Sequence, residues 1–593
     1  MTGAAEDDRT TQTTDWRLLL RLLRYLRPYV APTLAAFGLI VVMAGLDLAG
    51  PYITKIAIDE VIAPGRADLL PAVAGLYLLV LTLGFAVRSG QVFLLQITGQ
   101  RIVVDLRREI FAHLQKLHVG HLDKNPVGRL MTRVTTDVDA INELFTSGVV
   151  TVFGDLFTLA GIMAVMLSLN WKLALVTFAV LPFFFAVTDW FRRGARTSFR
   201  EVRALVARLN SFMQENLAGM AVVQLFRREA RNRQAFSAIN RDHMDANLKA
   251  IFYYAVFYPA IDLLAAVAIA LILWYGGGRV LDGALTLGAL VAFVQYSERF
   301  WRPISDLSEK FNIVQAAMAS SERIFGLLDT EPAIVAPAEP RALREVRGRI
   351  AFENVWFAYD GESWVLRDVS FVVEPGTTVA LVGATGAGKT SVISLLLRFY
   401  DPQRGRITLD GADIRELDPR ALRAATALVL QDVHIFSGSM ASNIRLGSPI
   451  PDARVRAAAE AVHLSRYIEA LAGGYDAPVR ERGATLSVGQ KQLLSFARAL
   501  AHEPRVLILD EATSSVDTET EGLIQDALRV LLAGRTAVVI AHRLSTIQSA
   551  DQILVLHKGK VRERGTHAQL LQAAGIYSRL HALQYQSLPL SAS

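Results

Sequence analysis

An eight-residue stretch, GATGAGKT at 383–390, has the composition and spacing of a phosphate-binding loop. It follows the apolar run TVALVG and precedes the apolar run SVISLLLRFY, so it is predicted to join a strand to a helix. Backbone N–H groups of such a turn, together with the helix N-terminus, suit the phosphates of a nucleotide. Lys389 would reach the β- and γ-phosphates, and the Thr390 hydroxyl would bind Mg²⁺. A glycine-rich turn with a fortuitous lysine is the alternative, and the flanking strand and helix count against it.

Two adjacent acids follow a second apolar run, in RVLILDEA at 505–512. Four apolar residues predict a buried strand that ends at Asp510, where a carboxylate would belong to the shell of Mg²⁺. Glu511 comes next and is placed to orient or deprotonate an attacking water. The alternative is a pair of solvated charges at a strand end.

Three further side chains are candidates for the same nucleotide site. His542, in VVIAHRLSTI, follows another apolar strand, and we expect it to contact the γ-phosphate or water rather than to be structural. Gln431, in ALVLQDVHIF, also ends a strand and could contact Mg²⁺ or water. Tyr359, in VWFAYD, is an aromatic that can stack on adenine, with an ordinary core tyrosine as the alternative.

The amino-terminal part of the chain differs in composition from this nucleotide-binding part. The 593 residues are 52% hydrophobic, which is high for a soluble protein. Six apolar segments are predicted to span a membrane: 32–54, 69–87, 148–169, 173–191, 251–275 and 283–297. Arginines concentrate in the long connections 96–147 and 192–250, which places these connections and the N-terminus in the cytoplasm. Buried helices of a soluble core are the alternative.

Helical patterns continue past the bilayer in both long connections, over 97–118 and 196–250. Their tips are predicted near 123–133 and 210–220, where Asn125-Pro126 and Gly219 would break the helices. The arginine-rich stretch 16–29 is predicted to be an interfacial helix.

Composition excludes several other classes of protein. The chain has no cysteine, so disulfides and zinc–cysteine sites are ruled out. The net charge of +6 lacks the aromatic-interleaved basic patch of RNA-binding proteins, and no nucleic acid partner is expected. The first fifteen residues have no apolar core typical of a signal peptide.

The phosphate loop, LSVGQ at 486–490, LILDEATSSVD and IAHRLST occur in an order that resembles the nucleotide-binding domain of ATP-binding cassette (ABC) proteins. Six preceding spans with long cytoplasmic extensions resemble the exporter type of half-transporter. The resemblance implies a multidomain fold class: an all-α six-helix transmembrane domain followed by an α/β P-loop domain. The expected bounds are a tail over 1–15, the transmembrane domain over 16–325, a linker over 326–348, the ATP-binding cassette over 349–585 and a tail over 586–593.

The resemblance also implies roles for individual residues. Tyr359 would stack on adenine, Gln431 would form the coupling loop, Asp510 and Glu511 would be the metal-shell and catalytic acids, and His542 would be the switch histidine. The phosphate loop would comprise Gly383, Ala384, Thr385, Gly386, Ala387, Gly388, Lys389, Thr390 and Ser391. Asp517 would end the SSVD segment that crosses the dimer interface. The two tips would be coupling helices, the cofactors would be ATP and Mg²⁺, and the location would be a bacterial cytoplasmic membrane.

One residue departs from the family pattern. The signature, usually Leu-Ser-Gly-Gly-Gln, acts in trans, so Ser487, Gly489 and Gln490 would close over ATP held by a second subunit. Val488 replaces the first glycine with a β-branched side chain, which restricts the backbone and fills space. A heterodimer with one degenerate ATP site is favoured, and a harmless variation in a homodimer is the alternative.

The sequence says less about the transported molecule than about the nucleotide site. Asp47, Asp155 and Asp262 fall inside apolar spans, where ionisable groups usually face a bundle interior. We expect a small amphiphilic substrate, a drug or lipid-like molecule, with Asp155 and Asp262 favouring cations. Helix–helix pairing of these acids is the alternative. A lipid or peptide exporter and a membrane-tethered regulatory ATPase remain other possible functions.

Overall fold

The computed structural model describes residues 16–343, 345–510, 518–541 and 544–585. It divides into two compact units, each of which is described by itself. The first unit comprises Met1–Leu114 and Gly128–Asp329, and the second comprises Gln115–Val127 and Thr330–Ser593. Residues 115–127 therefore group with the nucleotide-binding unit, and they overlap the first predicted tip, 123–133, only at 123–127.

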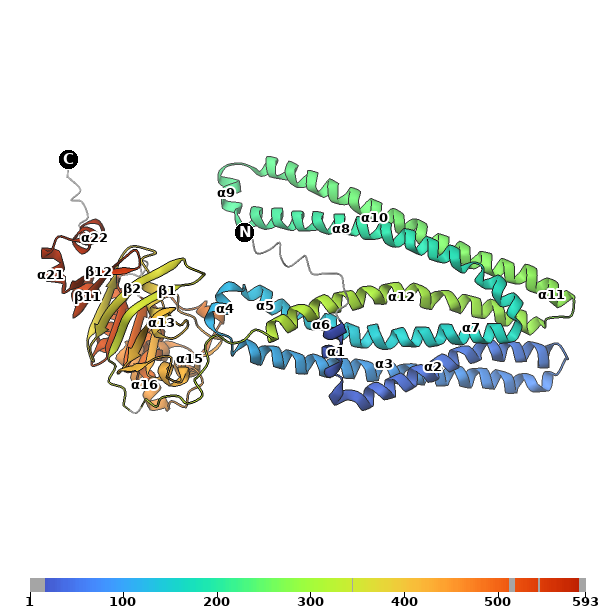
Figure 1. Cartoon of the computed structure of the whole chain (residues 1–593), viewed down its shortest axis with the longest axis horizontal. Helices are drawn as coiled ribbons and strands as arrows, with labels where there is room; N and C mark the ends of the chain where they lie inside the picture. The colour runs from blue at the N-terminus through green and yellow to red at the C-terminus, as the bar shows by residue number, and fades with distance from the viewer. Residues whose placement is uncertain (1–15, 344, 511–517, 542–543, 586–593) are drawn as a thin grey trace. The chain divides into compact units, whose positions relative to one another are not determined.

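Long helices build the first unit (Figure 1). They are α2 (Val30–Ile56), α3 (Leu70–Leu114), α7 (Val149–Phe178), α8 (Leu181–Ala218), α10 (Glu229–Leu271) and α12 (Leu287–Leu328). Four helical stretches of the described chain are long and apolar enough to cross a membrane: Arg27–Ile62, Ala67–Leu114, Val127–Phe178 and Glu229–Leu281. The predicted spans 173–191 and 283–297 lie instead on parts of α7, α8 and α12, helices that also carry charged extensions.

The predicted fourth span, 173–191, is interrupted in the structure. Helix α7 kinks at Asn170, whose side-chain oxygen accepts a hydrogen bond from Leu173 N, and the helix ends at Phe178. Helix α8 begins at Leu181 with Pro182 in its first turn. Because proline has no N–H to donate, the helical hydrogen bonding is interrupted here, and the predicted segment 173–191 is divided between α7 and α8.

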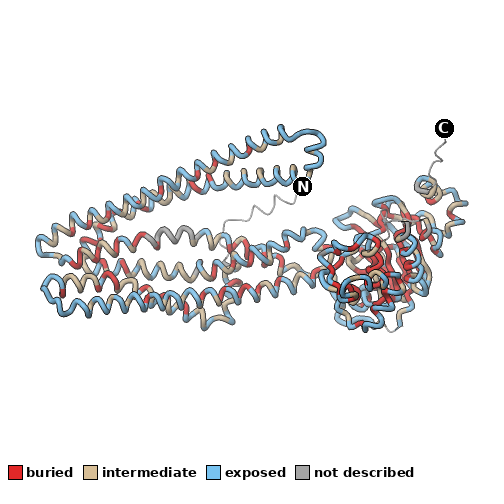
Figure 2. The backbone as a smooth tube through the Cα atoms, turned by 180° about the vertical axis from the view of Figure 1, so that it is seen from behind, coloured by how far each residue is buried: buried red, intermediate tan, exposed pale blue. Residues whose placement is uncertain are grey.

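The second cytoplasmic tip lies later in the chain than predicted. Residues 210–218 still belong to α8, and the turn begins at Gly219, the predicted breaker. The short helix at the tip is α9 (Met220–Leu225). Figure 2 shows this end of the α8–α10 hairpin as exposed, and Leu225 and Phe226 are 76% and 68% exposed. Within the described part of the unit, α8 and α10 contact mainly each other.

Helix α12 is the centre of the remaining helices. It packs against α2, α7 and the short helix α6 (Thr136–Glu143), with a buried apolar core between α7, α10 and α12. The amphipathic helix α1 (Trp16–Arg24) lies against the far end of α12. Its Arg21 donates two hydrogen bonds to Asp329, at 2.6 and 2.7 Å, and stacks on Phe325.

The second unit contains two main sheets. A six-stranded sheet has the order β12-β11-β3-β10-β9-β6 and is parallel except for its β11–β12 edge. Its strands are β12 (Lys560–Gly565), β11 (Gln552–His557), β3 (Thr378–Val382), β10 (Thr536–Ile540), β9 (Val506–Asp510) and β6 (Thr426–Val429). Apolar side chains on both faces are buried against helices, as expected for a parallel sheet. The covering helices include α13 (Lys389–Leu396), α18 (Val488–Ala501) and α19 (Thr518–Leu532).

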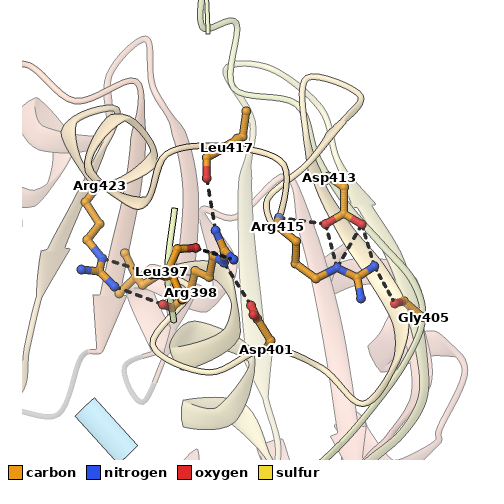
Figure 3. Close-up of polar contacts among 9 residues, drawn as sticks. Leu397, Arg398, Asp401, Gly405, Asp413, Arg415, Leu417 and Arg423 are labelled. Carbon is orange, nitrogen blue, oxygen red and sulfur yellow. Dashed lines mark hydrogen bonds and ion pairs between the residues drawn. The ribbon is translucent and has the colours of Figure 1, made fainter. Parts of the chain in front are cut away.

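A smaller antiparallel sheet has the order β2-β1-β4-β5. It comprises β2 (Trp364–Val373), β1 (Ile350–Ala358), β4 (Arg404–Leu409) and β5 (Ala412–Asp413). Arginine side chains form hydrogen bonds within the segment after α13 and to the loop that follows β5 (Figure 3). The Arg398 guanidinium, 5% exposed, donates to Asp401 Oδ1 at 3.1 Å and to the Leu417 carbonyl at 3.1 Å. These bonds fix the backbone on both sides of Tyr400.

Candidate functional site: the nucleotide-binding loop and its surroundings

The predicted phosphate loop joins β3 to α13, as its flanking runs require. Glycine is needed at two of its positions for different reasons. A Cβ on Gly383 would lie 2.3 Å from the Leu556 carbonyl oxygen, so only glycine permits this close approach. Gly388 adopts φ +103°, a left-handed conformation that other residues rarely reach, immediately before the first turn of α13.

Lys389 is held at the loop by the loop's own backbone. Its ammonium donates to the Gly383 carbonyl at 2.6 Å and to the Ala384 carbonyl at 3.2 Å. Burial lowers the pKa of Lys389, and the charge of Asp510 opposes that shift. Since Asp510 ends β9, the electrostatic contact brings together the cation and the acid that the sequence assigns to phosphate and metal.

The surface of the loop is open to a polyanion. Ala384, Thr385 and Gly386 are exposed, and so is Thr390, whereas Ala387 and Ser391 are buried. The residues present therefore fit a nucleotide: an exposed turn, a shielded ammonium, and a hydroxyl and a carboxylate of the type that Mg²⁺ prefers. When bound, Mg-ATP would supply the γ-phosphoryl group for hydrolysis.

Tyr359 follows β1 and lies beside the phosphate-loop helix. Its hydroxyl is 2.9 Å from the Ser391 Oγ, and its side chain is 40% exposed. A half-exposed ring at the end of a strand is available for stacking on a base. The geometry is compatible with the predicted contact to adenine.

Gln431 follows β6 and is exposed. Strand β6 pairs with β9 in parallel, so Gln431 and Asp510 leave the same edge of the sheet. The backbone after Gln431 is supported by Arg498 of α18, which donates to the His434 carbonyl at 3.1 Å and to the Asn443 carbonyl at 3.0 Å. Burial lowers the pKa of Arg498.

The signature segment forms the start of α18. Ser487 Oγ accepts a hydrogen bond from Gln490 N at 3.2 Å, and Gln490 Oε1 accepts one from Ser487 N at 2.9 Å, which closes a capping box. Gly489 is buried, and Val488 occupies the first helical position with 57% of its surface exposed. The backbone at Val488 is helical, and the first turn of a helix accommodates a β-branched residue, so the valine does not distort the backbone here. The valine therefore differs from glycine only in the added volume of a side chain that faces outward.

Three predicted site residues lie outside the described part of the chain: Glu511, Asp517 and His542. The strands that lead to the first and last of them are described. Strand β9 ends at Asp510, and its partner β10 ends at Ile540 opposite it.

A second group of residues at this site was missed by sequence reasoning. Helix α4 (Val119–Lys124) begins before the first predicted tip, 123–133, and overlaps it at Asp123 and Lys124; it belongs to the nucleotide-binding unit and lies close to Tyr359. The Tyr400 hydroxyl donates to Asp123 Oδ2 at 2.6 Å, and Lys124 Nζ lies 2.5 Å from Asp360 Oδ1. Such contacts join residues more than 230 positions apart, and no local pattern marks them.

Comparison with known proteins agrees with this architecture. The family model described as ABC transporter transmembrane region matches residues 33–304, and the family model described as ABC transporter matches residues 366–514. A Bacillus subtilis protein named probable multidrug resistance ABC transporter ATP-binding/permease protein YheH is 37% identical over 526 residues, with 87% of this chain and 78% of that protein covered. The fatty acid ABC transporter ATP-binding/permease protein of Mycobacterium bovis is 38% identical over 523 residues, covering 88% and 83%.

A solved structure resembles this chain over nearly its whole length. The structure of a bacterial Atm1-family ABC exporter with ATP bound has a TM-score of 0.76 and 30% sequence identity, and the match covers 96% of this chain and 99% of that one. The chain therefore belongs to the ABC transporter family, as a multi-pass half-transporter of the exporter type in which a helical transmembrane domain is followed by an ATP-hydrolysing cassette that uses ATP and Mg²⁺.

Proposed function

We propose that this chain is one half of a heterodimeric exporter that moves small amphiphilic molecules out of the cytoplasm by alternating access. ATP would clamp two cassettes together, the coupling helices would relay that closure to the membrane helices, and hydrolysis would release the clamp. The N-terminus and the cassette would lie on the cytoplasmic side of a bacterial inner membrane.

The need for a second subunit is supported by the α8–α10 hairpin. Its tip presents apolar side chains to solvent, including Leu217, Val222, Leu225 and Phe226 at 63%, 56%, 76% and 68% exposure. Exposed apolar patches of this kind mark sites of protein association. A partner subunit would cover them.

A heterodimer is supported by the signature segment. Val488 projects outward from an intact capping box, in the segment that would face the nucleotide of the other subunit. The phosphate loop, Lys389 and Asp510 of the same chain are complete. One chain thus combines an intact set of nucleotide ligands with an altered signature, which is expected where one ATP site hydrolyses and the other only binds.

The discriminating experiment is Val488→Gly in the reconstituted transporter, with the partner subunit present. In a heterodimer Val488 would contact only the degenerate ATP site, so Val488→Gly should change steady-state ATP hydrolysis by less than about twofold. In a homodimer both ATP sites would contain Val488, so Val488→Gly should change both the KM for ATP and the turnover number. A single molecular species of two identical 65.0 kDa chains with full activity would also refute the heterodimer.

The hydrolytic site is tested by Glu511→Gln. This single change should nearly abolish turnover and trap Mg-ATP, because the proposed general base would be lost. Substantial remaining hydrolysis would place the working site elsewhere. Substrate-stimulated ATPase activity in liposomes would separate a transporter from a regulatory ATPase that moves nothing.

The structure changes the expected basis of substrate choice. Asp155 forms an ion pair with Lys310 of α12, so it is already neutralised within the helical unit, and the expectation that it attracts cations is not supported. Asp262 on α10 is exposed in the single chain. A preference for cations would therefore depend on Asp262, and Asp262→Asn should reduce transport of cationic dyes several-fold while leaving an uncharged amphiphile unaffected.

A dedicated lipid exporter is the second candidate. The Mycobacterium bovis relative is named for fatty acids, and the Asp155–Lys310 pair leaves no clear anionic site at that position for drug cations. Equal transport of cationic and anionic amphiphiles by wild type and by Asp262→Asn would favour it.

A further inference from the structure

Helix α4 contacts two residues that lie beside Tyr359, the residue expected to stack on adenine: Tyr400 and Asp360. Its Asp123 accepts the 2.6 Å hydrogen bond from the Tyr400 hydroxyl, and its Lys124 pairs at 2.5 Å with Asp360, the residue directly after Tyr359. The Lys124–Asp360 pair is largely exposed and therefore contributes little to stability by itself. The first pair connects α4 to an aromatic ring in contact with Tyr359.

Three aromatic rings form this connection. The rings of Tyr400 and Tyr359 have centroids 5.2 Å apart and are nearly perpendicular, at 89°. Phe357 lies 4.7 Å from Tyr359 and 5.5 Å from Tyr400, and it is 1% exposed. The buried Phe357 ring packs against both tyrosine rings and limits where they can move. A change in the position of the Tyr359 ring therefore alters its edge contact with the Tyr400 ring.

Tyr400 has little freedom to absorb such a change. A Cβ on Gly120 of α4 would lie 2.6 Å from Tyr400 Cε1, so the helix backbone lies directly against the ring. The backbone on either side is held by the buried Arg398 and by Asp401 (Figure 3). The Tyr400 ring is therefore packed between a backbone segment held by hydrogen bonds and the backbone of α4.

We infer that Tyr400 is a positioning residue that reports occupancy of the adenine position to the coupling helix α4, through its ring contact with Tyr359 and its hydroxyl bond to Asp123. The inference rests on the proposed function, in which Tyr359 stacks on adenine. The Tyr359 hydroxyl lies 2.9 Å from the Ser391 Oγ, so the same ring also contacts the phosphate loop.

The prediction concerns coupling rather than binding. Tyr400→Phe keeps the ring and removes the hydroxyl, so ATP affinity should change little, while substrate stimulation of ATP hydrolysis should fall about fivefold, at the low end of typical coupling between two sites. Asp123→Ala should give the same loss. The double variant should lose no more than either single variant, because both changes break one bond.

A direct measurement follows α4 itself. The chain has no cysteine, so Leu122→Cys, at a 40% exposed position of α4, gives one labelling site for a fluorophore on the full-length transporter. Mg-ATP should change the label's emission in wild type and not in Tyr400→Phe. A nucleoside triphosphate with a pyrimidine base, which stacks less, should give a smaller change in wild type.

The matched control is Tyr25→Phe. It removes a hydroxyl bond of the same kind, from Tyr25 to Glu109 at 2.8 Å, and both of these residues belong to the helical unit. The Tyr25→Phe variant should show the same substrate stimulation of ATP hydrolysis and the same label response as wild type. A label response in Tyr400→Phe equal to wild type, or additive losses in the double variant, would overturn the inference. Failure of wild type to bind or hydrolyse Mg-ATP would instead refute the proposed function.

Discussion

Asp155 of α7 and Lys310 of α12 form an ion pair inside the helical unit, with only 20% and 15% of their side chains exposed. Removing one member of a buried pair leaves an uncompensated charge, at a cost of about 3–5 kcal/mol, whereas replacing both is far less harmful. Lys310→Met should therefore lower the thermal unfolding temperature of the detergent-solubilised protein. The double variant Asp155→Asn/Lys310→Met should recover most of the loss, and equal losses in single and double variants would contradict the pairing.

A second prediction concerns the phosphate loop. Gly383→Ala places a Cβ 2.3 Å from the Leu556 carbonyl, so the loop must shift and Mg-ATP binding should weaken by at least about tenfold. Equilibrium binding of a fluorescent ATP analogue measures this loss.

Gly376→Ala is the control for Gly383→Ala. Gly376 lies in a turn with φ +75° and open space around its Cβ position, so alanine there causes backbone strain without contact to the loop. Nucleotide affinity should stay at the wild-type value. Equal weakening by the two substitutions would show that general destabilisation, and not loop geometry, is responsible.

Acid stability of the smaller sheet should depend on Asp413. Burial raises the pKa of Asp413, but hydrogen bonds from Arg415 lower it more, and the net shift is downward. A carboxyl with a lowered folded-state pKa contributes stability above its unfolded pKa of about 4, and that stability is lost as the pH falls through the folded value. Asp413→Asn should reduce stability near neutral pH and flatten the fall below about pH 4.

Thermal unfolding of the full chain from about pH 6 to about pH 3 checks this behaviour. The gap between wild type and Asp413→Asn should narrow as the pH falls. A gap independent of pH would mean that the contribution of Asp413 is not ionic.

A fourth prediction concerns the start of α12. The Asp59 carboxylate, from the helical turn Ala57–Ile62 that follows α2, accepts hydrogen bonds from Gly288 N at 2.8 Å and from the Thr286 hydroxyl at 2.6 Å. It thus caps a helix from another segment, which typically contributes about 1 kcal/mol. Asp59→Ala should lower the unfolding temperature by a few degrees, and Glu60→Ala, a change at the neighbouring exposed acid, should not.

The phosphate loop, the strand-ending acid Asp510 and the signature at 486–490 were predictable from sequence because each is a local pattern. A glycine-rich turn between an apolar strand and an apolar helix specifies its own backbone, and the structure has β3 and α13 on its two sides. The long apolar helices followed for a similar reason, since length and composition alone predict membrane spans.

Contacts between distant segments were not predictable in this way. The break between α7 and α8 depends on Pro182 and on where α7 ends, the neutralisation of Asp155 depends on Lys310, and the bond between Tyr400 and Asp123 joins positions 277 apart. The sequence determined which elements form and which chemistry they carry, because propensity and motif spacing act over a few residues. Only the tertiary structure decided which of the charged and aromatic side chains are paired, because burial and partner geometry arise when the elements pack together.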